Sequence, residues 1–153
     1  MTYNRKVIPY SMSPPWTFWD FGDAIEDWHQ RLSEEAQYAF GSVLKNCAKV
    51  ENHLDWVAFK RFLKGVSESI WELEFTADRC KYRVLGMFAS GVATECWPKP
   101  LISIRKQAIL LIGCHHKGRV YTPPDAIGTA ERRAKLLKEG RGVLRERKIN
   151  QNI

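Results

Sequence analysis

Apolar and polar residues alternate with a period of two in the middle of the chain. In residues 70–75, the side chains of Trp71, Leu73 and Phe75 fall on one face of an extended chain and two glutamates fall on the other. The alternation returns in residues 81–87, after a short polar segment. This pattern predicts two antiparallel strands joined by a turn.

A second kind of strand is predicted further along, because residues 108–112 are apolar at every position. Successive side chains of a strand point to opposite faces, so both faces of this segment are apolar. Ala108, Leu110 and Ile112 are expected to face one way, and Gly113 is expected to end the strand. The segment therefore predicts a central strand of a sheet.

Apolar residues recur at helical spacing in two segments of the N-terminal half. Ile25, Trp28 and Leu32 predict a helix that begins near Asp23, and Ser33 is placed to cap a second helix. We expect these two helices to form a hairpin that lies on the sheet. The predicted buried face of the second helix consists of Ala36, Phe40, Val43, Leu44 and Cys47.

A third helix is predicted after residues 122–125, which supply a cap, two prolines and an acid favoured by the helix dipole. Gly140 is a suitable residue to end it. Its apolar face is narrow and consists of Ile127, Ala130, Ala134 and Leu137.

These elements divide the chain into three parts. Residues 1–19 are predicted to be an N-terminal arm with a candidate edge strand at residues 7–10. The aromatic residues at 16–19 are more typical of core or interface anchors than of base-stacking platforms. Residues 20–140 form the predicted domain. Residues 141–153 lose the periodicity and are basic, which predicts a flexible tail.

Composition narrows the class of protein. Hydrophobic residues make up 44% of the 153-residue chain, enough to bury a modest core and to argue against disorder. The formal net charge of +7 favours a polyanionic partner, such as RNA or DNA, or an acidic protein that neutralises it.

The cysteines and the longest apolar run indicate where the protein acts. No apolar leader segment is found, and the cysteines are widely spaced, so we expect reduced thiols and a cytoplasmic location. The apolar run at residues 108–112 is far too short to cross a bilayer, so no membrane partner is expected. The four cysteines are Cys47, Cys80, Cys96 and Cys114.

Chemically active side chains are concentrated directly after Gly113, where eight residues hold two imidazoles, an ammonium, a guanidinium and a phenol. Packing alone does not require this mixture. A zinc site that includes Cys80 or Cys96 is one alternative, but no C-x-x-C pair is present, so no metal or other cofactor is expected. The cluster consists of Cys114, His115, His116, Lys117, Arg119 and Tyr121.

The order of these motifs resembles the RelE/ParE toxin superfamily, and within it the HigB-like and phage-derived toxin-like branch. The resemblance covers about residues 20–140. It rests on Trp71-Glu72-Leu73-Glu74-Phe75, Tyr82-Arg83-Val84, Leu110-Leu111-Ile112-Gly113, His116-Lys117-Gly118-Arg119, Thr122-Pro123 and a helix with Thr129-Ala130 and Arg132-Arg133.

The resemblance implies an α+β fold, in which an N-terminal helical hairpin packs on a small antiparallel β-sheet, with a C-terminal helix. It also implies a toxin of a toxin-antitoxin system that acts as a ribosome-dependent mRNA endonuclease. The implied partners are the ribosome, mRNA and an antitoxin, often a helix-turn-helix protein. A homodimer is a further candidate assembly.

Metal-free RNA cleavage requires a group that takes the 2′-hydroxyl proton and cations that stabilise the phosphorane. Imidazole has a suitable ordinary pKa of about 6.5, and only one of two successive residues on a strand reaches a given face. We favour His116, which falls where the family places the first lysine of a pair. The candidate catalytic residues are His116, Lys117, Arg83, Tyr121 and His115. The candidate RNA-binding residues are Arg119, Arg79, Lys81, Lys64, Arg105 and Lys106.

Two other functions remain open at this stage. Glu74 stands where the family carries an arginine, and Arg83 could pair with Glu72 or Glu74 as a structural salt bridge. The chain could therefore be a non-catalytic, ParE-like inhibitor of a topoisomerase. Alternatively, it could be a phage-derived protein that keeps the fold without nuclease activity.

Overall fold

A computed structural model describes residues 14–149, which form a seven-stranded sheet covered by helices on both faces. The strand order is β2-β3-β4-β5-β1-β7, and β6 pairs with β5 outside this path. In chain order the elements are β1 (Thr17–Phe21), α1 (Ala24–Gln30), α2 (Glu34–Ala48), the 3-10 turn η1 (His53–Asp55), β2 (Phe59–Phe62), β3 (Trp71–Ala77), β4 (Cys80–Phe88), the 3-10 turn η2 (Thr94–Cys96), β5 (Gln107–Lys117), β6 (Val120–Thr122), α3 (Ala126–Lys138) and β7 (Leu144–Arg147).

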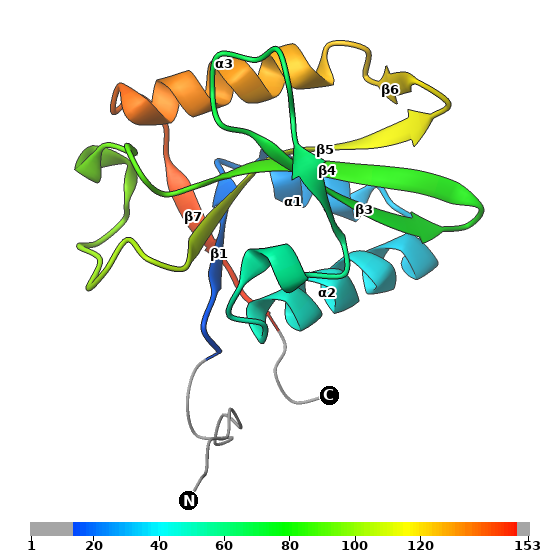
Figure 1. The fold of residues 1–153 in the computed structure, drawn as a ribbon, viewed down its shortest axis with the longest axis horizontal. Helices are drawn as coiled ribbons and strands as arrows, with labels where there is room; N and C mark the ends of the chain where they lie inside the picture. Colours follow the sequence, from blue (N-terminus) through cyan, green and yellow to red (C-terminus); the bar gives the residue numbers. More distant parts are fainter. Residues whose placement is uncertain (1–13, 150–153) are drawn as a thin grey trace, which may run out of the picture.

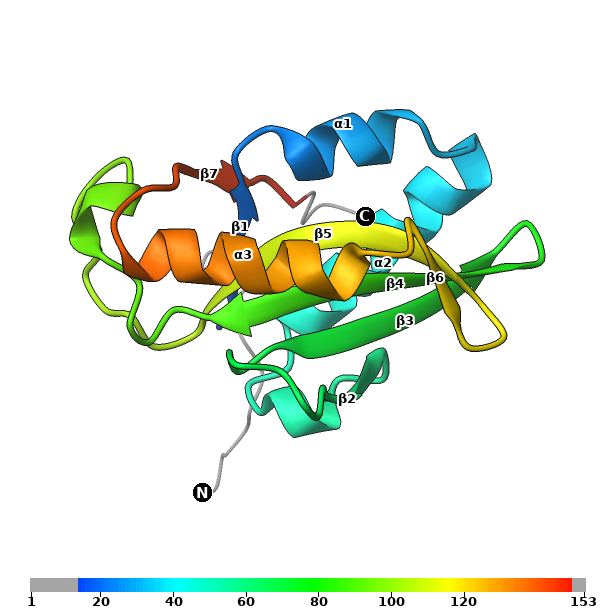
Figure 2. The same ribbon diagram turned by 90° about the horizontal axis from the view of Figure 1, so that it is seen from above.

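The sheet separates two hydrophobic clusters. Figure 1 shows α2 below the sheet and α3 above it, and in Figure 2 α3 crosses over β4 and β5. The first cluster packs Trp28 of α1 and Phe40 of α2 against Trp71 of β3. The second cluster packs Leu137 of α3 against Leu85 of β4. The face that carries α1 and α2 is called the α1–α2 face below, and the other is called the α3 face.

The predicted fold class is wrong. The sheet is mixed, because β1 lies parallel to β5 and antiparallel to β7, and it has seven strands. A helical hairpin on a small antiparallel sheet does not fit this arrangement. The alternating pattern of the sequence reveals only strands that pair locally. β1 is a five-residue strand with a buried centre, and β7 buries only Leu144, so neither shows a period-two pattern.

The two ends of the described chain meet in the sheet, where β1 pairs with β7. Trp16, Phe18 and Trp19 are buried, which confirms them as core residues. In place of a flexible tail, β7 lies beside β1, and both Nε and Nη2 of Arg147 donate to the carboxylate of Asp20 at 2.8–3.0 Å. The edge strand predicted at residues 7–10 lies outside the described residues.

Several local predictions are confirmed. The backbone N–H of Ala36 donates to the Ser33 hydroxyl at 3.1 Å, which caps α2. Gly140 follows α3 with a φ of +76°, the left-handed conformation that glycine adopts most readily. β3 and β4 form the predicted antiparallel hairpin. β2 was not predicted; it pairs with β3 at the edge of the sheet.

Candidate functional site

The direction of the two adjacent histidines is set by a β-bulge in the central strand. β5 pairs with β4 so that Leu85 faces Ile112 and Gly86 faces Leu110, which leaves Leu111 as one extra residue. An extra residue reverses the alternation of all side chains that follow it. Ile112 therefore joins the α3 cluster, although it was predicted to share a face with Ala108.

Gly113 does not end the strand, because β5 continues to Lys117. Gly113 is instead a packing position under Trp28 of α1. A Cβ atom at this residue would lie only 2.3 Å from the indole ring. The absence of a side chain thus allows α1 to lie against the strand just beyond the bulge.

The bulge leaves His115 and His116 on opposite faces. The His115 ring lies 4.7 Å from that of Tyr82 on the α1–α2 face. His115 also lines a cavity of about 430 Å³ between α1 and α3, together with Arg31 and Arg133. His116 lies on the α3 face and is paired across the strands with Lys81 and Tyr121. The prediction that only one imidazole reaches a given cleft is confirmed.

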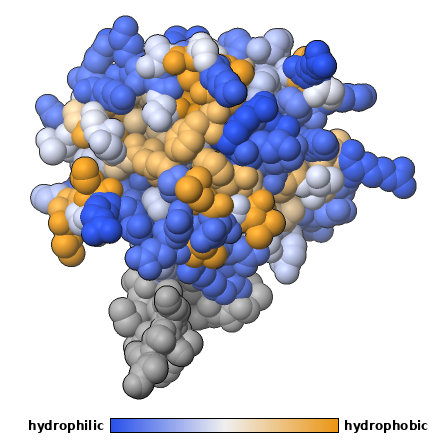
Figure 3. All heavy atoms as spheres, viewed as in Figure 1, coloured by the Kyte–Doolittle hydropathy of each residue, from blue (hydrophilic) through white to orange (hydrophobic). Residues whose placement is uncertain are grey.

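His116 lines a groove of about 730 Å³ on the α3 face. The groove lies between the β2–β3 connection, the β5–β6 hairpin and the start of α3. In Figure 1 the β2–β3 connection rises in front of the sheet toward α3, and Figure 3 shows hydrophilic atoms on both sides of an apolar band across the same view. The lining residues are Arg61, Phe62, Leu63, Lys64, His116, Gly118, Arg119, Tyr121 and Ile127.

Tyr121 connects His116 to a buried carboxylate. The rings of His116 and Tyr121 lie 4.8 Å apart in an edge-to-face arrangement, and the Tyr121 hydroxyl donates to Glu72 at 2.6 Å. Burial and the nearby Arg83 charge lower the pKa of His116, because both disfavour the imidazolium. Burial and the hydrogen bond to Glu72 raise the pKa of Tyr121 to about 12.

Arg83 is part of the same network and is not open to the groove. Its guanidinium donates to Glu72 at 2.7 Å and to Glu74 at 2.9–3.0 Å, and its side chain is only 5% exposed. Arg61 also pairs with Glu72 at 3.0 Å. Burial opposes ionisation of Glu74, but Arg83 and Lys60 outweigh it and lower the pKa of the Glu74 carboxyl. The structural salt bridge considered for Arg83 is therefore the observed contact.

The remaining residues predicted for catalysis or RNA binding lie partly at the groove and partly elsewhere. Lys64 and Arg119 line the groove, and Lys81 stands beside His116 in the cross-strand row. Arg79 lies in the β3–β4 turn with a φ of +63°. Lys117 is exposed and follows His116 on the strand, so it points to the other face.

Arg105 and Lys106 precede the opposite end of β5. They lie on the order of 30 Å from His116, at about 3.3 Å per residue of extended chain. The Lys106 ammonium lies 5.4 Å from the Trp16 ring. These two cations do not belong to the groove.

The cysteines are free thiols, and three of them are buried. Burial raises the pKa of Cys114 to about 12, and its thiol donates to the Arg83 carbonyl at 3.4 Å. Cys114 is thus a core thiol near the strand end. Within residues 14–149, no three His, Cys, Asp or Glu side chains are grouped as a metal site would require.

Two features of the site were missed by sequence reasoning. Glu72 was placed on the strand face opposite the apolar residues, but its burial was not predicted. It has no exposed surface and is contacted by Arg61, Arg83 and Tyr121. Its only sequence signal was a pair of glutamates two residues apart on one face of an alternating strand. The bulge has no sequence signal, because Leu111 is apolar like its neighbours.

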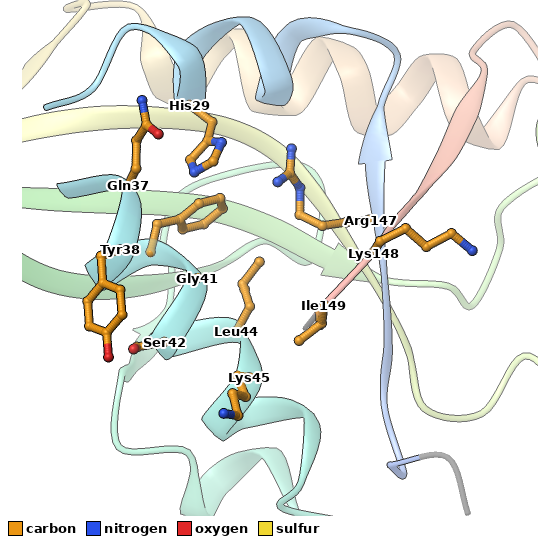
Figure 4. Close-up of a pocket in the computed structure, with 11 residues that line it drawn as sticks. His29, Gln37, Tyr38, Gly41, Ser42, Leu44, Lys45, Arg147, Lys148 and Ile149 are labelled. Atoms are coloured by element: carbon orange, nitrogen blue, oxygen red, sulfur yellow. The ribbon is translucent and has the colours of Figure 1, made fainter. Parts of the chain in front are cut away.

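A separate cavity of about 240 Å³ lies between α1, α2 and β7. Figure 4 shows His29, Tyr38 and Arg147 around it. The Arg147 guanidinium is held by Asp20 and Glu26, and the His29 ring lies 5.5 Å from that of Phe40. None of the residues predicted for catalysis or RNA binding lines this cavity.

The fold and groove define a mixed α/β domain with a cationic groove that contains an imidazole. Comparison with protein-family models, curated proteins and solved structures gave no match for this chain. In the part of the chain that the structure describes, no helix is both long and apolar enough to span a membrane.

Proposed function

We propose that this protein is a toxin that binds RNA in the groove beside His116 and cleaves it without a metal ion. The observation that carries the proposal is the make-up of the groove. Its described lining holds Arg61, Lys64, Arg119, one imidazole and one phenol, but no carboxylate. Such a surface attracts a phosphate backbone, and a neutral imidazole in it accepts a proton.

The proposed reaction is transfer of a phosphodiester to the neighbouring 2′-oxygen. His116 takes the proton of the 2′-hydroxyl, the 2′-oxygen bonds to phosphorus, and the bond from phosphorus to the 5′-oxygen breaks. The leaving 5′-oxygen takes a proton from water. Lys64 and Arg119 stabilise the charge of the phosphorane, since cations aimed at developing charge lower the barrier.

Tyr121 has a positioning role in this proposal. Its hydroxyl is committed to Glu72, and its raised pKa makes it a poor proton donor. The ring remains available to support the His116 imidazole or to stack on a base. We therefore assign the proton transfer to His116 and not to Tyr121.

The test is primer extension on an mRNA in a translating extract. Wild-type protein is compared with His116→Ala and with His115→Ala, which removes the same side chain from the opposite face. We expect in-frame cuts with wild type and with His115→Ala, and loss of these cuts with His116→Ala. Cuts that persist in His116→Ala would refute the role of His116.

A binding-only toxin is the second candidate, and the burial of Arg83 favours it. Arg83 is neutralised by two glutamates, and Lys117 faces away from His116, so fewer cations converge than a nuclease of this kind would use. Intact mRNA at doses that stop growth would support an inhibitor that acts by binding, such as one directed at a topoisomerase. A phage-derived protein without nuclease activity would neither cut mRNA nor stop growth.

The proposed cellular setting is the cytoplasm, with the ribosome and mRNA as targets and a helix-turn-helix antitoxin as the inhibitor. A neighbouring open reading frame for such a protein would support this setting. Co-expression tests it, because the antitoxin should restore growth and co-purify with the toxin. Growth arrest that no neighbouring gene relieves would contradict it.

A further inference from the structure

The bulge in β5 is held by a side chain from the helix above it. Arg133 of α3 donates from Nη1 to the backbone carbonyl of Leu111 at 2.7 Å. Leu111 is the extra residue of the bulge and has no partner of its own in the register with β4. A buried carbonyl without a donor is costly, so the Arg133 guanidinium satisfies a group that the bulge leaves free.

The bulge decides which histidine reaches the groove. Ala108 and Leu110, before the bulge, belong to the α1–α2 cluster. In a regular strand His116 would share their face, because side chains two residues apart point the same way. With one extra residue at Leu111, His116 lies on the α3 face beside Tyr121, and His115 takes the other face.

We propose that Arg133 is a positioning residue, which holds the Leu111 bulge and so directs His116, and not His115, into the groove. The importance of the His116 position for RNA cleavage rests on the proposed function. The hydrogen bond between Arg133 and Leu111 does not depend on that proposal. Arg133 does not line the groove; it contacts β5 through the Leu111 carbonyl, and it also lines the cavity beside His115.

The surroundings of Arg133 are consistent with a structural role for its guanidinium. It is half-buried, and its guanidinium lies 5.4 Å from the Phe21 ring of β1. Burial and the neighbouring Arg132 lower the pKa of Arg133, so these surroundings disfavour the charged guanidinium. The side chain reaches inward to the Leu111 carbonyl, whereas the Arg132 side chain is 66% exposed.

The test measures ring contacts of the histidines by NMR in labelled protein. Nuclear Overhauser effects between His116 and Tyr121, and between His115 and Tyr82, report which face each imidazole occupies. We compare wild type with Arg133→Met, which keeps the aliphatic stem but loses the donor. Arg133→Lys is the rescue variant, and Arg132→Met is the matched loss of one charge on the same helix.

We expect Arg133→Met to lose the His116–Tyr121 contact and Arg133→Lys to restore it, with Arg132→Met unchanged. Cleavage should fall by about tenfold or more in Arg133→Met, since a misplaced catalytic group costs up to ~10²-fold. If Arg133→Met does not fold, Arg133→Gln gives the same comparison, because its shorter amide does not reach Leu111. Unchanged ring contacts in the folded variant would overturn the inference, whether or not the wild type cuts RNA.

Discussion

The Tyr121 hydroxyl donates a hydrogen bond of 2.6 Å to Glu72, across 49 residues of sequence. It joins β6, at the margin of the sheet, to the buried carboxylate of β3. The same ring lies against His116. The position of the imidazole therefore depends on a carboxylate that is itself out of reach of solvent.

Replacing Tyr121 with Phe should weaken the fold while leaving the ring beside His116. The hydrogen bond to an ionised acceptor is worth about 1.5–3 kcal/mol, and we expect a loss of unfolding free energy in that range. Urea denaturation measures it. Tyr38→Phe is the control, because Tyr38 is 71% exposed and should change stability by less than about 0.5 kcal/mol. Equal effects of the two changes would contradict the role of the Glu72 contact.

Removing Glu72 should be more damaging than removing Glu74. Glu72→Ala leaves the buried Arg83 with Glu74 as its one remaining carboxylate and orphans Tyr121, and breaking a buried pair costs about 3–5 kcal/mol. Glu74→Ala should cost less, because Glu74 is 20% exposed and Arg83 keeps Glu72. Thermal and urea unfolding of both variants give the comparison. A Glu74 variant as unstable as the Glu72 variant would show that the network is centred elsewhere.

Gly113→Ala tests the close approach of α1 to β5. The added methyl would overlap the Trp28 ring, and overpacking of this kind costs about 1–3 kcal/mol. Gly41→Ala is the opposite case, since a Cβ there meets no atom within 4 Å and the residue lies within α2. We expect this control to stabilise the protein by about 0.5–1 kcal/mol. A neutral Gly113→Ala would mean that Trp28 moves aside freely.

The lowered pKa of His116 makes predictions about pH. Burial and Arg83 disfavour the imidazolium, so NMR titration should place the His116 pKa below the ordinary value of about 6.5. Between those two values the unfolded chain binds more protons than the folded one. The contribution of His116 to stability therefore rises with pH through this window and is lost as the pH falls below about 6.5.

The control for this measurement is His116→Gln, because the lowered pKa of His53 contributes in the same direction. The difference in unfolding free energy between wild type and His116→Gln should change between about pH 5 and about pH 8. If His116 accepts the 2′-hydroxyl proton, the acid limb of the cleavage rate should also lie below about pH 6.5. A His116 pKa above that value would contradict the predicted environment.

The features that could be predicted from sequence are those set by neighbouring residues, and the features that were missed depend on pairing between distant residues. The alternation in β3 and β4 and the cap at Ser33 are properties of neighbouring residues, so the sequence was sufficient to predict them. The parallel pairing of β1 with β5 joins residues far apart and leaves no periodic signal. The same holds for the candidate site. The cluster after Gly113 could be recognised in the sequence, but the faces to which its side chains point depend on one extra residue at Leu111.

The placement of β1 has a consequence for the order of folding. Its neighbours in the sheet are β5 and β7, and Trp19 bonds to Gln107 over a separation of 88 residues. Contacts this distant in sequence form slowly, because a long loop must close first. During synthesis, β1 has no strand neighbour until β5 and β7, within residues 107–147, have been made. The nascent chain should therefore depend on chaperones, and a slow ribosome over this last segment should lower the yield of folded protein.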